Sequence, residues 1–402
     1  MRFTLCDARL IDATSDISHG SVAIEDTHIQ AIEDTEYVDA HQAQSIDASG
    51  MIVIPGFIDV HTHGGGGYNL QTTDPDEIRE YARWAPKTGT TSFLIVVVGV
   101  PGSIPEKQLK TAIEVLQDQG NGAEPVGIHL EGPYISVAKR GAHLPSWLRT
   151  PEESDTEQLL QLTNGHLRLL TLAPELPGAS AMIRRLVNAG ITVSMGHTNA
   201  TYEQSLEAIK LGVTHATHCF NAMRPLLHRA PGPIAAIAQS DQVRGELIAD
   251  GVHVHPAAMH ALVKLLGPHR IVVITDALSG AGASESTFDF AGQPAKVIRG
   301  AARLSDGTLT GSVLTMDQAL RNMRLMTGAT LQQVVGMMTL NPALAAQVSH
   351  RKGRLKAGYD ADVLVLDQSL ELQASFCKGT VAFATEKWRE KLSTLLHSKT
   401  LP

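Results

Sequence analysis

The chain has 402 residues, of which 43% are hydrophobic and 18% are charged, and its formal net charge is −8. This composition excludes general disorder and is typical of a globular protein with one large domain and one smaller domain. The negative charge excludes a broad surface for nucleic acid or for an anionic membrane, because such surfaces concentrate Lys and Arg, and an anionic substrate would need a local basic site.

The cysteines and the apolar runs indicate the cellular compartment in which the protein is expected. Cys6, Cys219 and Cys377 lie far apart without C-x-x-C spacing, which indicates neither a disulfide framework nor a thiolate zinc site. The N-terminus has no apolar leader, and the most hydrophobic run, residues 93–100, is too short to span a bilayer. We therefore expect a cytoplasmic protein that does not enter a membrane.

The two ends of the chain share short β-like runs separated by turn residues. Residues 20–24 and 28–32 are runs of this kind, and residues 353–367 again indicate a turn followed by a strand. We therefore expect residues 1–54 and 347–385 to form one small discontinuous β-sandwich domain.

Residues 55–346 alternate apolar β-rich runs with helix-like segments, which is typical of an α/β protein with a parallel sheet. The eight candidate strands lie at residues 52–60, 91–98, 126–130, 168–173, 191–195, 213–217, 246–250 and 270–275. Eight βα units predict a closed (β/α)₈ TIM-like barrel, and a doubly wound open sheet is the structural alternative. The barrel is favoured because polar residues follow its strands, where such barrels place their active sites.

Histidines and acids follow several predicted strands. His61 and His63 lie two residues apart at a strand end, so their side chains project to the same face and can converge on one ion. Glu131 and Asp276 follow the third and eighth strands, where a buried carboxylate needs a metal or a basic partner. The other histidines after strands are His197, His218 and His253.

Each of these residues also has an ordinary structural interpretation, but their joint placement predicts a metal-dependent hydrolase. Beside a metal that activates water, Asp276 could accept a proton as base and return it as acid, although it could also cap the next helix. The sequence contains no G-x-S-x-G elbow, phosphate-binding G-x-x-x-x-G-K-[ST] loop or H-E-x-x-H helix, which excludes the chemistries that those motifs support.

Seven short motifs follow one another in a specific order. They are PGFIDVHTHG (55–64), HLEGP (129–133), GHT (196–198), THCFNAM (217–223), HRAPG (228–232), DGVH (250–253) and TDA (275–277). Together they resemble the N-acetylglucosamine-6-phosphate deacetylases of the amidohydrolase superfamily, and the resemblance extends from the start to about residue 368. It implies an amidohydrolase-type barrel for the large domain.

The resemblance also implies a set of ligands. Glu131, His197 and His218 would hold one divalent metal, whereas the residues that would hold or border a second are His61, His63 and Asp276. Family members differ in the first of these motifs, and those that retain H-x-H are expected to bind two metals. Imidazole and carboxylate ligands suit Zn²⁺, Fe²⁺, Co²⁺ or Mn²⁺.

Catalytic and substrate-binding roles follow from the same resemblance. Asp276 would be the general base and acid, His143 would polarise the acetyl carbonyl, and Arg229 would bind the phosphate, across the interface of a homodimer. The other implied substrate contacts are Ala142, Asn221, Ala222, His253 and, within the segment 309–314, Ser312, Val313 and Leu314.

The expected reaction is hydrolysis of the acetamide of N-acetylglucosamine 6-phosphate, a small amino-sugar phosphate, to glucosamine 6-phosphate and acetate. Metal-dependent hydrolysis follows from the residues, whereas the sugar phosphate follows from the resemblance. Cys219 and Ala230 depart from the family pattern and leave the sugar open between this substrate, its galactosamine epimer and another small amide. A catalytically silent scaffold would have lost metal ligands, and all six positions are intact here.

Overall fold

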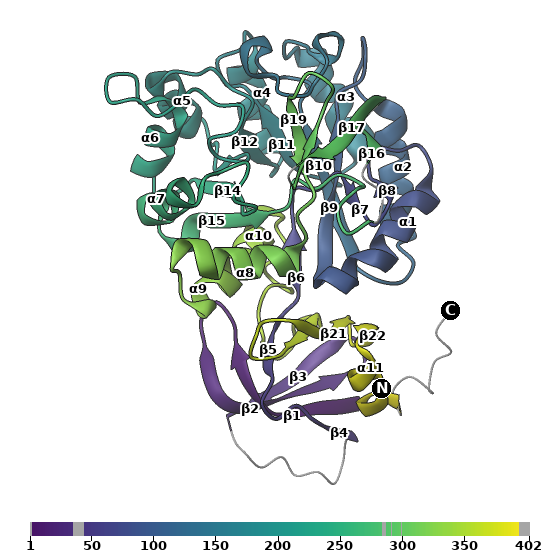
Figure 1. Ribbon diagram of the computed structural model, residues 1–402. Helices are drawn as coiled ribbons and strands as arrows, with labels where there is room; N and C mark the ends of the chain where they lie inside the picture. Colours follow the sequence, from purple (N-terminus) through teal and green to yellow (C-terminus); the bar gives the residue numbers. More distant parts are fainter. Residues whose placement is uncertain (1, 35–43, 284–286, 291, 299, 394–402) are drawn as a thin grey trace.

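The computed structural model describes residues 2–34, 44–283, 287–290, 292–298 and 300–393. Figure 1 shows a large barrel with its surrounding helices and, below it, a small sheet built from both ends of the chain. Among the described residues, none of the helices is long and apolar enough to cross a bilayer.

The small sheet joins the two chain ends through β5. This strand pairs in parallel with β1 and in antiparallel orientation with β20, in the order β22-β21-β20-β5-β1-β2-β3, with β4 beside β1. The strands are β1 (Arg2–Ile11), β2 (Asp16–Glu25), β3 (His28–Glu33), β4 (Gln44–Asp47), β5 (Ile52–Pro55), β20 (Val363–Leu366), β21 (Leu372–Cys377) and β22 (Thr380–Ala384). Their apolar faces share a core with Trp388 of α11 (Glu386–Lys391).

Eight parallel strands form the barrel in the order β15-β14-β13-β12-β11-β10-β9-β6, which confirms the predicted architecture. They are β6 (Phe57–Asp59), β9 (Thr90–Val98), β10 (Glu124–Glu131), β11 (Leu167–Leu172), β12 (Thr192–Met195), β13 (His215–Ala216), β14 (Arg244–Ile248) and β15 (Ile271–Ile274). The first and last strands meet just beyond their ends, where the Asp276 N–H donates to the His61 carbonyl at 2.8 Å. Every residue of β9 is buried, as expected for a strand covered on both sides.

The predicted first strand, residues 52–60, is wrong as a single element, because the chain divides it between two sheets. β5 belongs to the small sheet and β6 to the barrel, and Gly56 lies between them. A Cβ atom at Gly56 would lie 2.0 Å from the Thr91 hydroxyl oxygen, so only glycine allows the chain to cross so close to β9.

Helices between the strands cover the outside of the barrel (Figure 1). They are α1 (Pro75–Trp84), α2 (Glu106–Gln117), α3 (Glu153–Thr163), α4 (Ala179–Asn188), α5 (Tyr202–Lys210), α6 (Gly232–Gln239), α7 (Pro256–Leu266), α8 (Met316–Thr327), α9 (Leu331–Met338) and α10 (Leu340–Ala345). The start of α5 shows how the sequence sets a boundary: the Thr201 hydroxyl accepts the Gln204 N–H, and the Gln204 side chain accepts the Thr201 N–H.

An antiparallel sheet that the strand count did not predict follows β15. Its strands are β16 (Thr287–Phe290), β17 (Gln293–Ile298), β18 (Ala301–Arg303) and β19 (Leu309–Ser312). The Gln293 side-chain amide donates to the Ala142 carbonyl at 3.0 Å. This bond ties the inserted sheet to the loop that follows β10.

A buried ion cluster joins the small sheet to the base of the barrel. The Lys352 side chain is 1% exposed, and its ammonium lies 2.7 Å from Glu124 at the start of β10, 2.9 Å from Asp360 and against Asp362. Arg351 donates two hydrogen bonds of 2.9 Å to Glu124. Burial raises the pKa of Glu124, but Arg351 and Lys352 together lower it to about 2.

Candidate metal centre and active site

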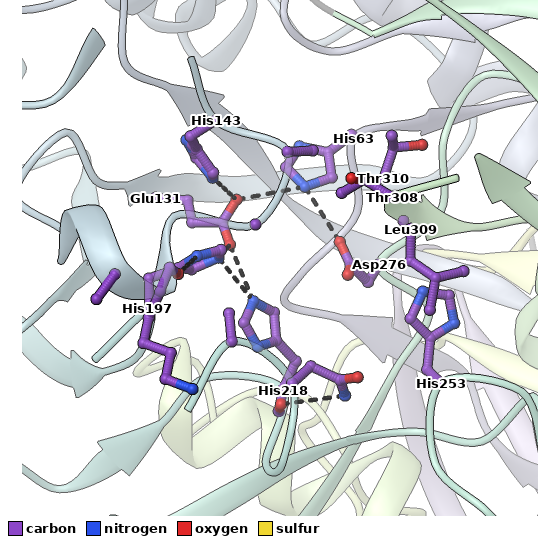
Figure 2. Close-up of a pocket in the computed structure, with 17 residues that line it drawn as sticks. His63, Glu131, His143, His197, His218, His253, Asp276, Thr308, Leu309 and Thr310 are labelled. Atoms are coloured by element: carbon purple, nitrogen blue, oxygen red, sulfur yellow. Dashed lines mark hydrogen bonds and ion pairs between the residues drawn. The ribbon is translucent and has the colours of Figure 1, made fainter. Parts of the chain in front are cut away.

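The barrel brings the predicted strand-end residues to one place, at its C-terminal mouth (Figure 2). Glu131 is the last residue of β10, and three others stand two residues beyond the ends of β12, β13 and β15: His197, His218 and Asp276. His61 stands two residues beyond β6, with His63 following. All six side chains are buried or nearly so.

Three of these residues adopt a backbone conformation that is unusual for residues other than glycine. The φ angles are 46° at His197, 27° at His218 and 48° at Asp276, all in the left-handed region. Such conformations carry strain of about 1–3 kcal/mol each and cluster at functional sites. The strain at all three strand ends independently supports a functional role for these side chains.

The first group of potential ligands surrounds one oxygen of Glu131. Oε1 lies 3.1 Å from His197 Nε2 and 3.2 Å from His218 Nε2, and these two nitrogens are 3.0 Å apart. The Lys139 carbonyl lies 2.9 Å from His197 Nδ1 and can only accept, so the hydrogen is on Nδ1 and the Nε2 lone pair faces the group. Lone pairs and a carboxylate that converge in this way fit a divalent cation.

The second group lies on the other side of Glu131. His63 Nε2 is 3.1 Å from Asp276 Oδ1, and His61 Nε2 is 3.6 Å from the same oxygen. Both imidazoles also face Glu131 at 3.4 Å, His61 toward Oε1 and His63 toward Oε2. His61 Nε2 is buried and has no hydrogen-bond partner within the part of the chain that the structure describes. These residues therefore also fit a divalent cation, and Glu131 faces both groups.

Charge and burial set the protonation states of this site. Burial raises the pKa of Glu131, but the imidazoles that surround it, His61 first and then His143 and His197, hold that pKa well below its usual range. Burial likewise opposes ionisation of Asp276, but the contact with His63 lowers its pKa. Burial lowers the pKa of His143. At neutral pH the two acids are therefore charged and His143 is neutral.

A cavity of about 330 Å³ opens beside the two groups. The sequence-predicted residues that line it are His63, Glu131, Ala142, His143, His197, His218, Asn221, Ala222, His253 and Asp276. His61 is buried and is not among the lining residues. Leu309, Thr310 and Gly311 of β19 also line the cavity, and they belong to the segment 309–314 that the resemblance implied. Sequence reasoning missed Ala138, Lys139 and Thr308.

Four predicted substrate contacts lie outside this lining. Ser312, Val313 and Leu314 come just after the lining residues of β19 and do not line the cavity themselves. The Ser312 hydroxyl donates to the Thr275 carbonyl and accepts the Leu314 N–H, so it holds the backbone of the residue before Asp276 in place. Arg229 is exposed on the loop between β13 and α6.

His253 is oriented by an acid in its own motif. Its Nδ1 lies 2.6 Å from Asp250 Oδ2, and Asp250 Oδ1 accepts the backbone N–H groups of Val252 and His253. This pairing leaves Nε2 of His253 as the nitrogen that is not bound to Asp250. Burial lowers the pKa of His253, but the bond to Asp250 outweighs it and raises the pKa.

Glu246 of β14 is a further residue that sequence reasoning missed. Its side chain is 0% exposed beneath the cavity and contacts His61, His215 and the backbone of His218. The sequence did contain a sign of it, since an acid within a short apolar strand needs a partner. His215, the first residue of β13, is one of those partners.

Comparisons with known proteins agree with this geometry. Residues 52–388 match the amidohydrolase family. The chain is 34% identical to N-acetylglucosamine-6-phosphate deacetylase from Lysinibacillus sphaericus, over 87% of this chain and 90% of that protein. It is 37% identical to N-acetylgalactosamine-6-phosphate deacetylase from Escherichia coli O157:H7, over 82% of this chain and 88% of that protein.

A solved structure agrees as well. N-acetyl-D-glucosamine-6-phosphate deacetylase from Mycobacterium smegmatis, as a mutant in complex with N-acetyl-D-glucosamine-6-phosphate, superposes with a TM-score of 0.87 at 34% identity, over 96% of this chain and 99% of that one.

Proposed function

The chain belongs to the amidohydrolase family, and from its site we propose that it hydrolyses the acetamide of N-acetylglucosamine 6-phosphate to glucosamine 6-phosphate and acetate. The observation that carries the proposal is the convergence of six potential metal ligands beside a cavity that contains His143 and His253. Relatives over most of the chain that are named for this reaction support the choice of substrate.

A divalent metal at this site would polarise the acetyl carbonyl and acidify a water molecule. Asp276 accepts the proton of the attacking water, because its lowered pKa keeps it ionised, and passes that proton to the nitrogen of the departing amine. His143 is neutral and faces the same space, so its N–H can donate to the carbonyl oxygen as negative charge develops there.

Two metals per chain are part of this proposal. Two groups of ligands, one around His197 and one around His63, share Glu131 between them, which supports two positions. Zn²⁺, Fe²⁺, Co²⁺ and Mn²⁺ all suit imidazole and carboxylate ligands, so availability would select among them.

The phosphate of the substrate would be bound by Arg229 of a second copy of the chain. Arg229 is exposed and outside the cavity lining of its own chain, and the neighbouring Leu226 and Leu227 are 44% and 52% exposed. An arginine on an exposed loop with apolar neighbours suits a subunit contact. A homodimer is therefore part of the proposal.

We also propose the division into a small domain, residues 1–54 and 347–385, and a barrel domain, residues 55–346. The membership of β1 to β5 and β20 to β22 in one sheet supports this division. Free cysteines at three separate positions support a reducing, cytoplasmic location.

Deacetylation of N-acetylgalactosamine 6-phosphate is the second candidate, favoured by the 37% identity to an enzyme of that name. The two sugars differ at one hydroxyl group, so one experiment separates the candidates. Acetate release by the metal-loaded protein is measured with both sugar phosphates and with unphosphorylated N-acetylglucosamine. We expect the highest kcat/KM with N-acetylglucosamine 6-phosphate. A preference for the galactosamine epimer supports the second candidate, and no release from any of the three refutes both.

A further inference from the structure

Glu246 is a fully buried acid inside the barrel. It lies on β14, where Gly245 to Ile248 are all buried, and it is not part of the cavity lining. Its ion-pair partners among the described residues are His61 and His215. Burying a carboxylate in this way is unfavourable without tight hydrogen bonding, so both of its oxygens need donors close by.

Both oxygens of Glu246 accept hydrogen bonds from residues of the site. Oε2 lies 2.9 Å from His61 Nδ1 and 3.0 Å from the backbone nitrogen of His218, and Oε1 lies 3.1 Å from His215 Nε2. A carboxylate can only accept, so Nδ1 of His61 carries the hydrogen. The lone pair of His61 is then on Nε2, the atom that faces Asp276 and Glu131.

A separate metal site at Glu246 is a less suitable explanation. The atoms of His61, His129 and Glu246 lie close enough together to suggest one. However, His129 Nδ1 lies 3.0 Å from the Val60 carbonyl and Nε2 lies 2.8 Å from the Thr171 hydroxyl. A carbonyl only accepts, so Nδ1 carries a hydrogen, and both ring nitrogens of His129 are already in use.

We propose that Glu246 is a positioning residue that sets the occupancy of the metal position at His61 and His63. It holds His61 in one tautomer and one orientation, with Nε2 presented to the ion, and it supports the position at His197 and His218 only through the His218 backbone. Loss of a carboxylate behind a ligating histidine typically lowers metal affinity by about 10–100-fold. The inference rests on the proposed metal-dependent function.

The variant Glu246→Gln tests the proposal. Glutamine keeps the shape but has one accepting oxygen for three donors, because its NH₂ group cannot accept a hydrogen bond. The purified full-length protein is freed of metal and titrated with Co²⁺ against a chromophoric chelator, which reports the number of ions bound and their affinities. We expect two binding events in the wild type. In Glu246→Gln we expect an unchanged tighter event and a weaker event with about 10–100-fold lower affinity.

Combining variants separates positioning from a general loss of packing. His61→Asn should abolish the weaker event, and adding Glu246→Gln to His61→Asn should then change nothing further, because the residue through which Glu246 acts is absent. The Co²⁺ absorption spectrum of the remaining ion should be the same in both variants. A further loss of the tighter event in the double variant would overturn the proposal.

Other outcomes are equally decisive. Two unchanged events in Glu246→Gln overturn the proposal, as does equal weakening of both. If this variant does not fold, Glu246→Asp keeps the charge but shortens the reach, and it should still weaken the second event, so an unchanged affinity would overturn the proposal. Wild-type protein that binds one ion yet releases acetate refutes this inference and the second metal position but leaves the proposed reaction standing. Protein that binds two ions and hydrolyses no sugar refutes only the proposed reaction.

Discussion

Replacement of Asp276 by Asn should stop proton transfer while leaving the fold intact. The backbone groups of residue 276 hold the barrel together, since its N–H donates to His61 and its carbonyl accepts the Ser312 N–H, and the substitution changes neither. The side chain loses the charge that faces His63 at 3.1 Å and can no longer accept a proton. General acid–base catalysis is worth about 10²–10⁴-fold in rate, so we expect kcat to fall by that factor, or about 2.7–5.4 kcal/mol in the barrier.

The assay is acetate release at saturating N-acetylglucosamine 6-phosphate, with metal content and thermal melting measured on the same sample. Asp241→Asn, at an exposed residue before β14, is the matched control and should keep the wild-type rate. Asp276→Asn should retain at least one metal, because Glu131, His197 and His218 are untouched. A folded Asp276→Asn variant with metal and the full rate would refute the assignment of the base.

Three further predictions concern the metals, the phosphate and stability. Replacing His61 by Gln and His63 by Asn should lower the metal content from about two to about one per chain by elemental analysis, and an unchanged content would contradict the two-metal proposal. Arg229→Ala should raise KM for the sugar phosphate by about 10–100-fold, since hydrogen bonds to charged groups are worth about 1.5–3 kcal/mol, with no such effect on unphosphorylated N-acetylglucosamine. An equal rise in KM for both sugars would show that Arg229 does not bind the phosphate. The pKa of Glu124 is about 2 in the folded protein, compared with 4.5 ordinarily. The ionised carboxylate therefore stabilises the fold above about pH 4.5, and this stabilisation is lost as the pH falls toward 2. Glu124→Gln should lower the free energy of unfolding by about 3 kcal/mol at pH 7, at ~1.36 kcal/mol per pKa unit, and by much less near pH 2. Equal denaturant midpoints for the variant and the wild type at pH 7 would contradict this.

The amino-acid sequence alone predicted the barrel and the residues at its mouth. Eight apolar runs separated by helical stretches specify a parallel sheet, and the barrel geometry places the ends of its strands together. Glu131, His197 and His218 could therefore be grouped even though they lie far apart along the chain. The prediction of one first strand over residues 52–60 is wrong, because the apolar run on both sides of Gly56 is continuous in sequence. Only the packing of Gly56 against Thr91 divides this run between two sheets.

The tertiary structure decided what depends on contacts between distant segments. Glu246 lies 185 positions from His61, and no local pattern reveals that its carboxylate meets the imidazole Nδ1. Leu309, Thr310 and Gly311 of β19 line the cavity because an inserted sheet folds back over the mouth, whereas Arg229 lies outside the cavity of its own chain. Strand periodicity and motif spacing report which side chains share a strand end. Which atoms then face one another depends on how the whole barrel closes.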